Sequence, residues 1–475
     1  MIVSDTINDQ AGKRVDSPEN TKSSHTQRSL SLCLALTLLL LRISRASGEE
    51  DTVGYRHEYY REDNNRIKVD TDSTHFDVGL GSKVRLNGDL VMDAISGATP
   101  TGAPPQTQWP FPTYNNLYQT AYGQAYTGQF NQFVSQNQVY VDAGYETFQQ
   151  MTNAAAQFAQ STAPTIATNS ATASYHSLTN SPNFKKNTVP LTQMHDYRVG
   201  FSLNLPVALG NNQITPSVAY SEESDYLSRG LALNDSIFLN HKNTTLNLGW
   251  SHNFDRVRDD KFIWQNKDSD DFLAGLVQLL GPKSYLTANL TFGNESGYLS
   301  DPYRGVMAAS NFLQANPDDA ALFPEKRPRH RTKEIVYLSW TQFISPFNGS
   351  LEVAYRYFHD SWEVNAHTME LDWHQKIGKR IVISPSFRYY YQTAASFYNV
   401  TVPDFNNLPA VYSADYRLSE FESFAYGVRV TYKIQRHVSL DAGYMRYVMN
   451  GLDGVTSPSA YPSANVFSIG ARLWF

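Results

Sequence analysis

The sequence predicts an all-β protein, a transmembrane antiparallel up-and-down β-barrel with about sixteen strands or, as the alternative, about fourteen. Three observations lead to this prediction. Apolar residues alternate with polar ones along many segments, and short turns alternate with longer connections. An apolar run near the N-terminus has the length of a signal-peptide core.

The C-terminal segment shows the alternation most clearly. Apolar residues occupy every second position from Phe467 to Phe475, and Gly470 and Arg472 are among the residues between them. Because successive side chains of a strand point to opposite faces, this strand has one apolar and one polar face. A soluble sandwich shows the same pattern, with its apolar face in a dry core. The signal peptide, the terminal aromatic residue and the unequal connections favour a barrel, whose apolar face contacts lipid.

Repetition of this pattern divides the chain into strands. Their even number puts both ends of the chain on the periplasmic side. Asp268–Leu280 also fits helical spacing, so a short helix is the alternative there. The predicted strands cover residues 52–61, 66–80, 83–95, 190–207, 213–225, 229–240, 243–256, 268–280, 283–298, 329–345, 349–361, 367–376, 379–394, 415–433, 437–449 and 464–475.

The connections between these strands alternate in length. Short turns such as Gly210–Asn212 and Gly281–Lys283 alternate with longer connections near 299–328, 395–414 and 450–463. Outer-membrane barrels have short turns on the periplasmic side and longer loops outside. The longer connections are therefore predicted to lie on the outer side.

The longest connection, at about 96–189, is a low-complexity segment. Asp142 and Glu146 are its only formal charges between Asp93 and Lys185. Long connections are usually functional or disordered, so we predict either a mobile outer loop or a constriction that folds into the lumen. Thr147–Thr162 contains neither proline nor glycine and is a candidate short helix.

The N-terminal part is predicted to be a signal peptide and leader at residues 1–48, followed by the barrel at 49–475. Leu30–Leu41 is an apolar run of about a dozen residues, which is too short to span a membrane as a helix. Cys33, the only cysteine, lies inside this leader. We therefore expect no disulfide, thiolate cluster or cysteine nucleophile in the mature chain.

The composition excludes two other classes of protein. Charged residues make up 18% of the 475 residues and the formal net charge is −6, so no basic excess indicates nucleic-acid binding. A mean hydropathy of −0.43 excludes a polytopic helical membrane protein. It does not exclude a barrel, in which only alternate residues face lipid.

Inward-pointing charged residues are the most specific candidate functional feature. They could be paired charges that make a polar interior rigid, or a charged constriction that selects solutes by sign. Both signs occur, so the sequence predicts no preference for anions or cations. The alternation assigns to the lumen Arg85, Asp89, Asp93, Glu352, Arg356, Arg388, Arg429, Asp441 and Arg472.

Motifs for catalysis and metal binding are absent from the sequence. It contains no G-x-S-x-G elbow, H-E-x-x-H pair or P-loop. His359, His367 and His374 cluster loosely, but His367 and His374 are seven residues apart and would point to opposite faces of one strand. We therefore predict no metal site, no cofactor and no enzymatic activity.

Two longer peptides stand out from the general barrel pattern. Residues Ser96-Gly97-Ala98-Thr99-Pro100 form the first, and Gly297-Tyr298-Leu299-Ser300-Asp301-Pro302-Tyr303-Arg304 form the second. Both are similar to peptides of a Gram-negative outer-membrane β-barrel family that is catalogued as a domain of unknown function. The resemblance implies an outer-membrane barrel over nearly all of the mature chain, and it implies no activity.

These observations predict a protein of the outer membrane of a Gram-negative bacterium. The leading hypothesis is a passive channel for small solutes. The first alternative is a surface or scaffold barrel with a closed lumen that binds a partner through its outer loops, and the second is a hydrolase at the rim. The expected partners are outer-membrane lipid, small solutes and, through the C-terminal strand ending at Phe475, the barrel assembly machinery.

Overall fold

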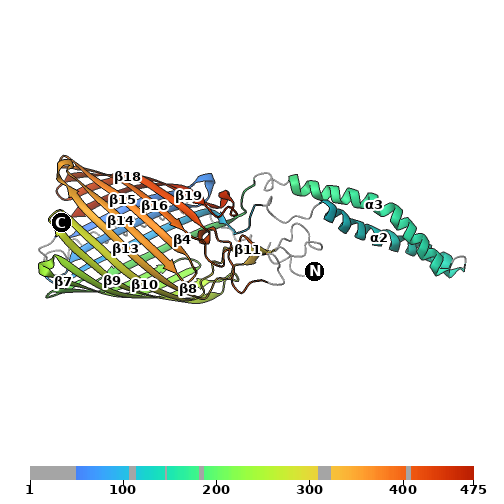
Figure 1. Ribbon diagram of the computed structural model, residues 1–475, viewed down its shortest axis with the longest axis horizontal. Coiled ribbons are helices and arrows are strands. Elements are labelled where there is room, and N and C mark those ends of the chain that lie inside the picture. The colour runs from blue at the N-terminus through green and yellow to red at the C-terminus, as the bar shows by residue number, and fades with distance from the viewer. Residues whose placement is uncertain (1–49, 106–113, 145–146, 181–186, 309–321, 403–407) are drawn as a thin grey trace.

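The computed structural model describes residues 50–475 except for 106–113, 145–146, 181–186, 309–321 and 403–407. Its main body is a closed antiparallel barrel of sixteen strands (Figure 1). β4 and β5 both pair with β6 and are two parts of one interrupted strand. The predicted signal peptide and leader lie outside the described residues.

The strands follow one another round the barrel in chain order. β20 pairs with β1 and closes the ring, with Gly470 opposite Arg56. The strands are β1 (Thr52–Glu62), β2 (Lys68–Gly79), β3 (Arg85–Pro100), β4 (Leu191–Asn204) with β5 (Val207–Leu209), β6 (Asn212–Glu222), β7 (Tyr226–Leu239), β8 (Thr244–Arg258), β9 (Trp264–Gly281), β10 (Ser284–Gly297), β13 (His330–Ile344), β14 (Gly349–Asp360), β15 (Asn365–Ile377), β16 (Ile381–Gln392), β18 (Phe421–Gln435), β19 (Val438–Gly451) and β20 (Ser463–Trp474).

Each barrel strand corresponds to one predicted segment, so the count of sixteen is confirmed and the count of fourteen is wrong. The alternative helix at Asp268–Leu280 is also wrong, because β9 pairs with β8 and with β10 along this segment. The predicted strand at 415–433 begins too early. Asp415 instead caps a 3-10 helix, η7 (Tyr416–Leu418), by accepting a hydrogen bond from the backbone N–H of Arg417.

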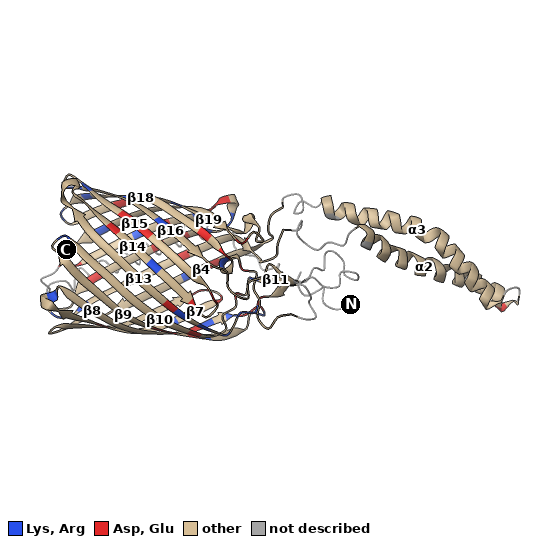
Figure 2. Cartoon of the chain, viewed as in Figure 1, with Lys and Arg blue, Asp and Glu red and all other residues tan. Residues whose placement is uncertain are grey.

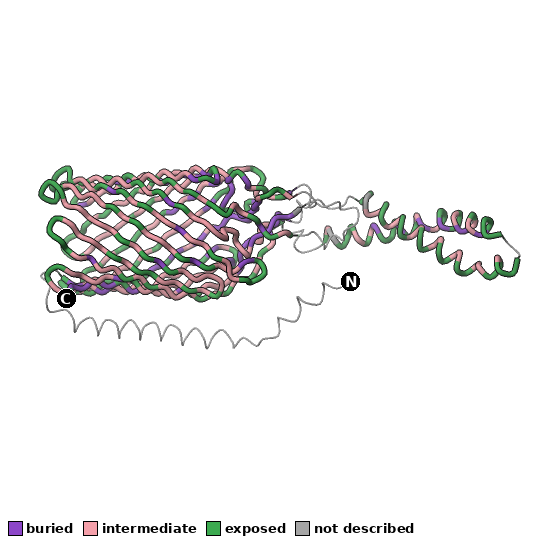
Figure 3. Tube along the Cα trace, turned by 90° about the horizontal axis from the view of Figure 1, so that it is seen from below, coloured by how far each residue is buried: buried purple, intermediate pink, exposed green. Residues whose placement is uncertain are grey.

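The register gives the barrel an apolar outer face. Leu231, Leu248, Leu290 and Leu338 are exposed and lie on the face that would contact lipid. Exposed and partly buried residues alternate along the strands (Figure 3). None of the helices in the described residues is long and apolar enough to cross a membrane.

The segment predicted as a long outer loop contains two helices, α2 (Tyr114–Asp142) and α3 (Phe148–Asn180). They pack against each other as a hairpin that extends beyond one end of the barrel (Figure 1). Met151 and alanines at every fourth position up to Ala171 are buried along α3. Small residues at this spacing let two helices approach closely. The sequence analysis expected only Thr147–Thr162 to be helical, and it expected strand β3 to end before Pro100.

Two other outer connections fold into a compact structure that we call the cap. It comprises the described residues 298–308, 322–329, 393–402 and 408–420. Its strands β11 (Gly305–Ala308), β12 (Leu322–Pro324) and β17 (Thr401–Val402) form a small separate sheet. Buried residues gather at this end of the barrel (Figure 3). The remaining short helices are η1 (Asp63–Asn65), η3 (Asn240–Lys242), η5 (Ser345–Phe347) and η8 (Pro458–Ala460).

Candidate functional site

The register places all nine predicted lumen residues on the inner face of the barrel, at many levels rather than in one cluster. Charged residues are distributed along the strands and near the cap, whereas the helical hairpin is almost uncharged (Figure 2). The lumen is therefore lined with charge over most of its height.

Six of the nine residues have polar partners on an adjacent strand or, for Asp441 of β19 and Arg56 of β1, on the next strand but one. Three ion pairs are Arg85 Nε with Asp77 at 2.7 Å, Arg198 with Asp93 at 2.5 Å and Arg388 with Glu370 at 3.1 Å. Asp441 lies 3.3 Å from Arg56, and Asp89 lies 2.9 Å from the His75 ring. Ser339 donates a hydrogen bond to Glu352 at 3.2 Å. None of these partners was predicted from the sequence, because alternation gives the face of a residue but not its cross-strand register.

The other three arginines, Arg356, Arg429 and Arg472, form no ion pair with any residue in the described ranges. Arg356 and Arg388 line a cavity of about 360 Å³ in the lumen. Arg429 lines a second cavity of about 420 Å³, and Arg472 lines a third of about 140 Å³. These three arginines therefore line cavities inside the barrel without an ion-pair partner in the described part of the chain.

The inner face of β6–β10 is built mainly of small residues, and we call it the small-residue wall. An added Cβ at Gly249 would lie 2.3 Å from Asn234 Oδ1, and one at Gly275 would lie 2.6 Å from Asn289 Oδ1. The amide side chains therefore lie flat over glycine positions instead of filling the lumen. The wall includes Ser217, Ala219, Ser221, Ser228, Gly230, Ala232, Asn234, Gly249, Ser251, Gly275 and Asn289.

A buried ion network holds the cap together. Asp415 is buried and lies 2.5 Å from Arg417, 2.7 Å from Arg327 and 3.8 Å from Arg304. Burial alone would raise the pKa of Asp415, but the surrounding guanidinium groups hold it well below its ordinary value of 3.8. Glu325 extends the network through Arg327 at 2.6 Å. The carboxylate of Asp415 is thus the anion shared by three cap arginines.

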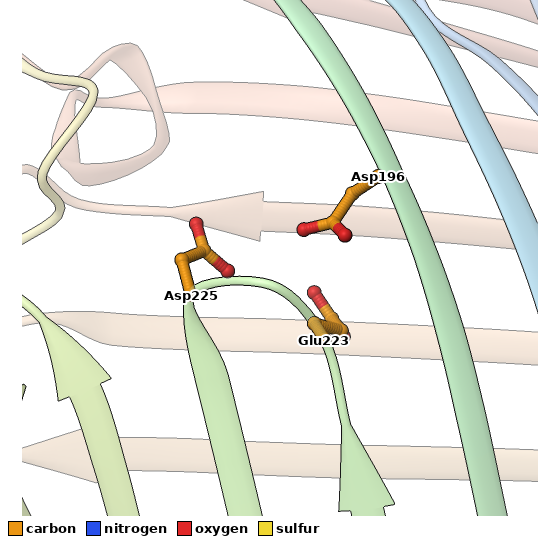
Figure 4. A group of neighbouring side chains, drawn as sticks. All are labelled: Asp196, Glu223 and Asp225. Atoms are coloured by element: carbon orange, nitrogen blue, oxygen red, sulfur yellow. The ribbon is translucent and has the colours of Figure 1, made fainter.

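Three acidic side chains converge at the outer end of β4 and the β6–β7 turn (Figure 4). The carboxylate oxygens of Asp196, Glu223 and Asp225 lie within 4.8 Å of one another. Ser224 donates to Asp196 at 2.9 Å, and the Tyr303 hydroxyl donates to Asp225 at 2.5 Å. These bonds join the turn to β4 and to the cap. No single-sequence spacing indicated this cluster, because its members come from separate strands.

Glu223 is the unfavourable charge of this acidic cluster. Burial raises its pKa above 4.5, and the neighbouring Asp196 and Asp225 raise it further. Because its folded pKa exceeds the unfolded value, the stability that protonated Glu223 provides is lost as the pH rises through the folded pKa. Glu223→Gln should therefore stabilise the protein at pH 7.5 by roughly 0.2–1 kcal/mol, the range for partly exposed charge pairs.

Urea unfolding in lipid vesicles with EDTA measures this effect. The gain should disappear below about pH 4, where Glu223 is protonated in both states. Glu222→Gln is the matched control, since its carboxylate accepts from the Tyr220 hydroxyl at 2.6 Å outside the cluster. If Glu223→Gln instead lowered the stability at pH 7.5, the inference that ionised Glu223 destabilises the folded protein would be wrong.

The described histidines do not form a cluster. The register places His367 on the outer face near Tyr355, whereas His374 points inward and lies 2.9 Å from Ser384 Oγ. This confirms that the two histidines face opposite sides. Within the described ranges, no hydrogen bond joins His374 to a carboxylate, and Asp89 separates His75 from Ser202. The expectation that the protein is not an enzyme stays a prediction.

The comparison with protein families identifies the chain. A model described as a protein of unknown function, DUF3570, matches residues 32–261 and 254–457. The chain belongs to the DUF3570 family. This match confirms the resemblance seen in the two peptides. A closed sixteen-stranded barrel that is apolar outside and polar inside places this DUF3570 chain in the outer membrane of a Gram-negative bacterium.

No curated protein matches this DUF3570 chain. Solved structures with a similar barrel include the siderophore receptor PirA from Pseudomonas aeruginosa, with 7% identity and a TM-score of 0.39 over 90% of this chain and 62% of the receptor. CdiB from Acinetobacter baumannii has 8% identity and a TM-score of 0.44 over 90% and 60% of the two chains.

A third similar structure is OccK2 (OpdF) from Pseudomonas aeruginosa in complex with glucuronate, with 8% identity and a TM-score of 0.38 over 90% of this chain and 98% of OccK2. The DUF3570 chain spans only about 60% of the length of PirA and CdiB. Identities and scores this low limit the similarity to the general form of a barrel.

Proposed function

We propose that this protein is a passive channel through which small polar solutes cross the outer membrane. The observation that carries the proposal is the small-residue wall, which leaves space along one side of a polar lumen. Halfway round the ring from β7 and β8 are β18 and β19, which carry Arg429 and Asp441. A barrel of sixteen strands is wide enough for an aqueous channel unless loops or a plug fill it.

The cavities in the lumen support the same function. Three of them, of about 360, 420 and 540 Å³, are lined by polar and charged residues of different strands. The largest extends from the acidic cluster to cap residues Asp301, Arg327 and Arg417. Because the cap occupies the outer end, we propose that it restricts the channel to small solutes.

The purified, refolded protein in a planar bilayer should give stable, stepwise current in KCl solution. Current is expected because water and ions fill the space beside the small-residue wall. Heat-modifiable migration in a gel verifies folding, and protease protection in vesicles verifies insertion. A silent bilayer with verified insertion would contradict the channel.

A second candidate function is a scaffold that binds a partner through its outer structures. The observation that favours it is the α2–α3 hairpin, which extends beyond the barrel and exposes Phe148, Phe158 and Ile166. Deleting residues 114–180 distinguishes the two functions. The channel proposal expects the current to persist after the deletion, since no described residue of the hairpin lines the cavities of about 360, 420 and 540 Å³.

A further inference from the structure

Four arginines converge on one cavity beneath the cap. Arg331 of β13, Arg356 of β14, Arg388 of β16 and Arg417 of the cap line a space of about 220 Å³. We call these residues the arginine junction. None of the described residues that line this cavity is acidic. Arg356 and Arg388 also line the adjoining cavity of about 360 Å³, whose lining includes the Arg388 partner Glu370.

Three members of the junction are already neutralised by acidic partners. Arg331 donates to Asp360 Oδ2 through Nε at 2.8 Å and through a terminal nitrogen at 2.5 Å. Arg388 pairs with Glu370 at 3.1 Å, and Arg417 pairs with Asp415 at 2.5 Å. These ion pairs fix the positions of the three guanidinium groups.

Arg356 is the member without a partner. Its side chain is exposed to the lumen, and no ion pair or hydrogen bond joins it to another residue of the described chain. The junction therefore has one guanidinium group that forms no ion pair within the described part of the chain. A guanidinium presents two parallel N–H donors, which match the two oxygens of a carboxylate.

The remaining lining residues determine what else the ligand must contain. Phe358, Val364, Tyr390 and Leu418 line the same cavity and give it an apolar side. The Arg388 guanidinium lies 5.6 Å from the centre of the Tyr390 ring, which holds it beside this apolar surface. The cavity thus presents a single free cation next to aromatic and aliphatic side chains.

We infer that the arginine junction is a binding site for a small organic acid with one carboxylate and an apolar body. The carboxylate pairs with Arg356, and the body lies against Phe358 and Tyr390. The inference rests on the proposed function, because a ligand reaches the junction only through the lumen. It adds a chemical class of solute to that function.

Calorimetric titration of the folded, detergent-solubilised protein with benzoate tests the site. Wild-type protein should bind benzoate, and Arg356→Gln should weaken binding about tenfold, or about 1.4 kcal/mol. Arg429→Gln is the matched control, because it removes an equally unpaired inward charge from a different cavity. The control should change the dissociation constant less than about twofold, which is well under 1.4 kcal/mol.

Arg356→Lys provides a second variant in case the glutamine variant does not fold. It keeps the charge but loses the paired donors, so benzoate binding should be intermediate. Equal losses in Arg356→Gln and Arg429→Gln would overturn the site, and so would tighter binding of inorganic phosphate than of benzoate.

Bilayer current separates this inference from the proposed function. If the protein carries stepwise current but does not bind benzoate, the proposed binding site is wrong and the proposed channel function stands. If the protein binds benzoate through Arg356 but carries no current, the proposed channel function is wrong and the proposed binding site stands.

Discussion

Replacing Asp415 by asparagine is expected to release the cap from the outer mouth. Removing the charge leaves Arg304, Arg327 and Arg417 close together without their common anion. Breaking a buried ion pair in this way costs about 3–5 kcal/mol. The opened cap should be populated about a hundred-fold to a few thousand-fold more often, since about 1.4 kcal/mol corresponds to a factor of ten.

Trypsin treatment of the protein in vesicles measures this release. Cleavage after Lys326 or Arg417 should accelerate in proportion to the opened population, because neither residue precedes a proline. The current in a bilayer should also rise, because the cap occupies the outer end of the proposed channel.

Asp453→Asn is the matched control for Asp415. Asp453 also accepts backbone hydrogen bonds in an outer turn, from Val455 at 3.1 Å and Thr456 at 2.9 Å, but it has no arginine partner in the described chain. Its replacement should change cleavage only slightly. Equal cleavage of the two variants would show that the arginine network does not hold the cap.

The low pKa of Asp415 determines the pH range over which this network stabilises the cap. Its folded pKa lies below the unfolded value of 3.8, so the stabilisation is present above that pH and is lost as the pH falls through the folded pKa. The difference between wild type and Asp415→Asn should therefore be the same at pH 5 and pH 8.

The strands could be predicted because the alternation of apolar and polar residues lies within each strand's own sequence. Every second residue of the segment ending at Phe475 contacts lipid, so the period of two is visible without knowing the partner strand. The alternation at β9 was harder to recognise because Phe272, Leu273 and Leu276 also fit helical spacing. Pairing with β8 and β10 selects the strand there.

Only the segment Thr147–Thr162 of the helical hairpin was predicted to be helical, and the rest was missed for a physical reason. Its helices have no apolar stripe opposite a charged face, which is the usual sign of a surface helix. The available signal was the repetition of alanine at every fourth position, from Ala155 to Ala171, which is buried along α3.

The site was predicted only in part. Alternation assigned Arg356 and Arg388 to the lumen. It could not show that Arg388 pairs with Glu370, or that Arg356 has no ion-pair partner among the described residues. Arg417 and Asp415 lie in a cap that is assembled from connections far apart in the sequence, so no local pattern indicates their burial. Pairing partners and loop packing both depend on the closed barrel.

The assignment of the two barrel faces can be tested at adjacent residues of β7. Leu233 is 50% exposed and lies opposite Trp250 on the outer face, near the middle of the strand. Ala232 lies on the inner face opposite Ser251, within the small-residue wall. The same substitution at these two positions therefore puts a charge in lipid or in the lumen.

Leu233→Arg should destabilise the folded barrel by about 2–4 kcal/mol, the cost of an arginine on the lipid face near the bilayer midplane. Ala232→Arg should leave the stability of the barrel nearly unchanged, because the new guanidinium extends into a polar lumen. It should lower the single-channel current, because the arginine narrows the lumen beside the small-residue wall. Urea unfolding in lipid vesicles, followed by tryptophan fluorescence, measures the first effect, and a planar bilayer measures the second. A larger loss of stability in Ala232→Arg than in Leu233→Arg would mean that the two faces are reversed and that the arginine junction faces lipid.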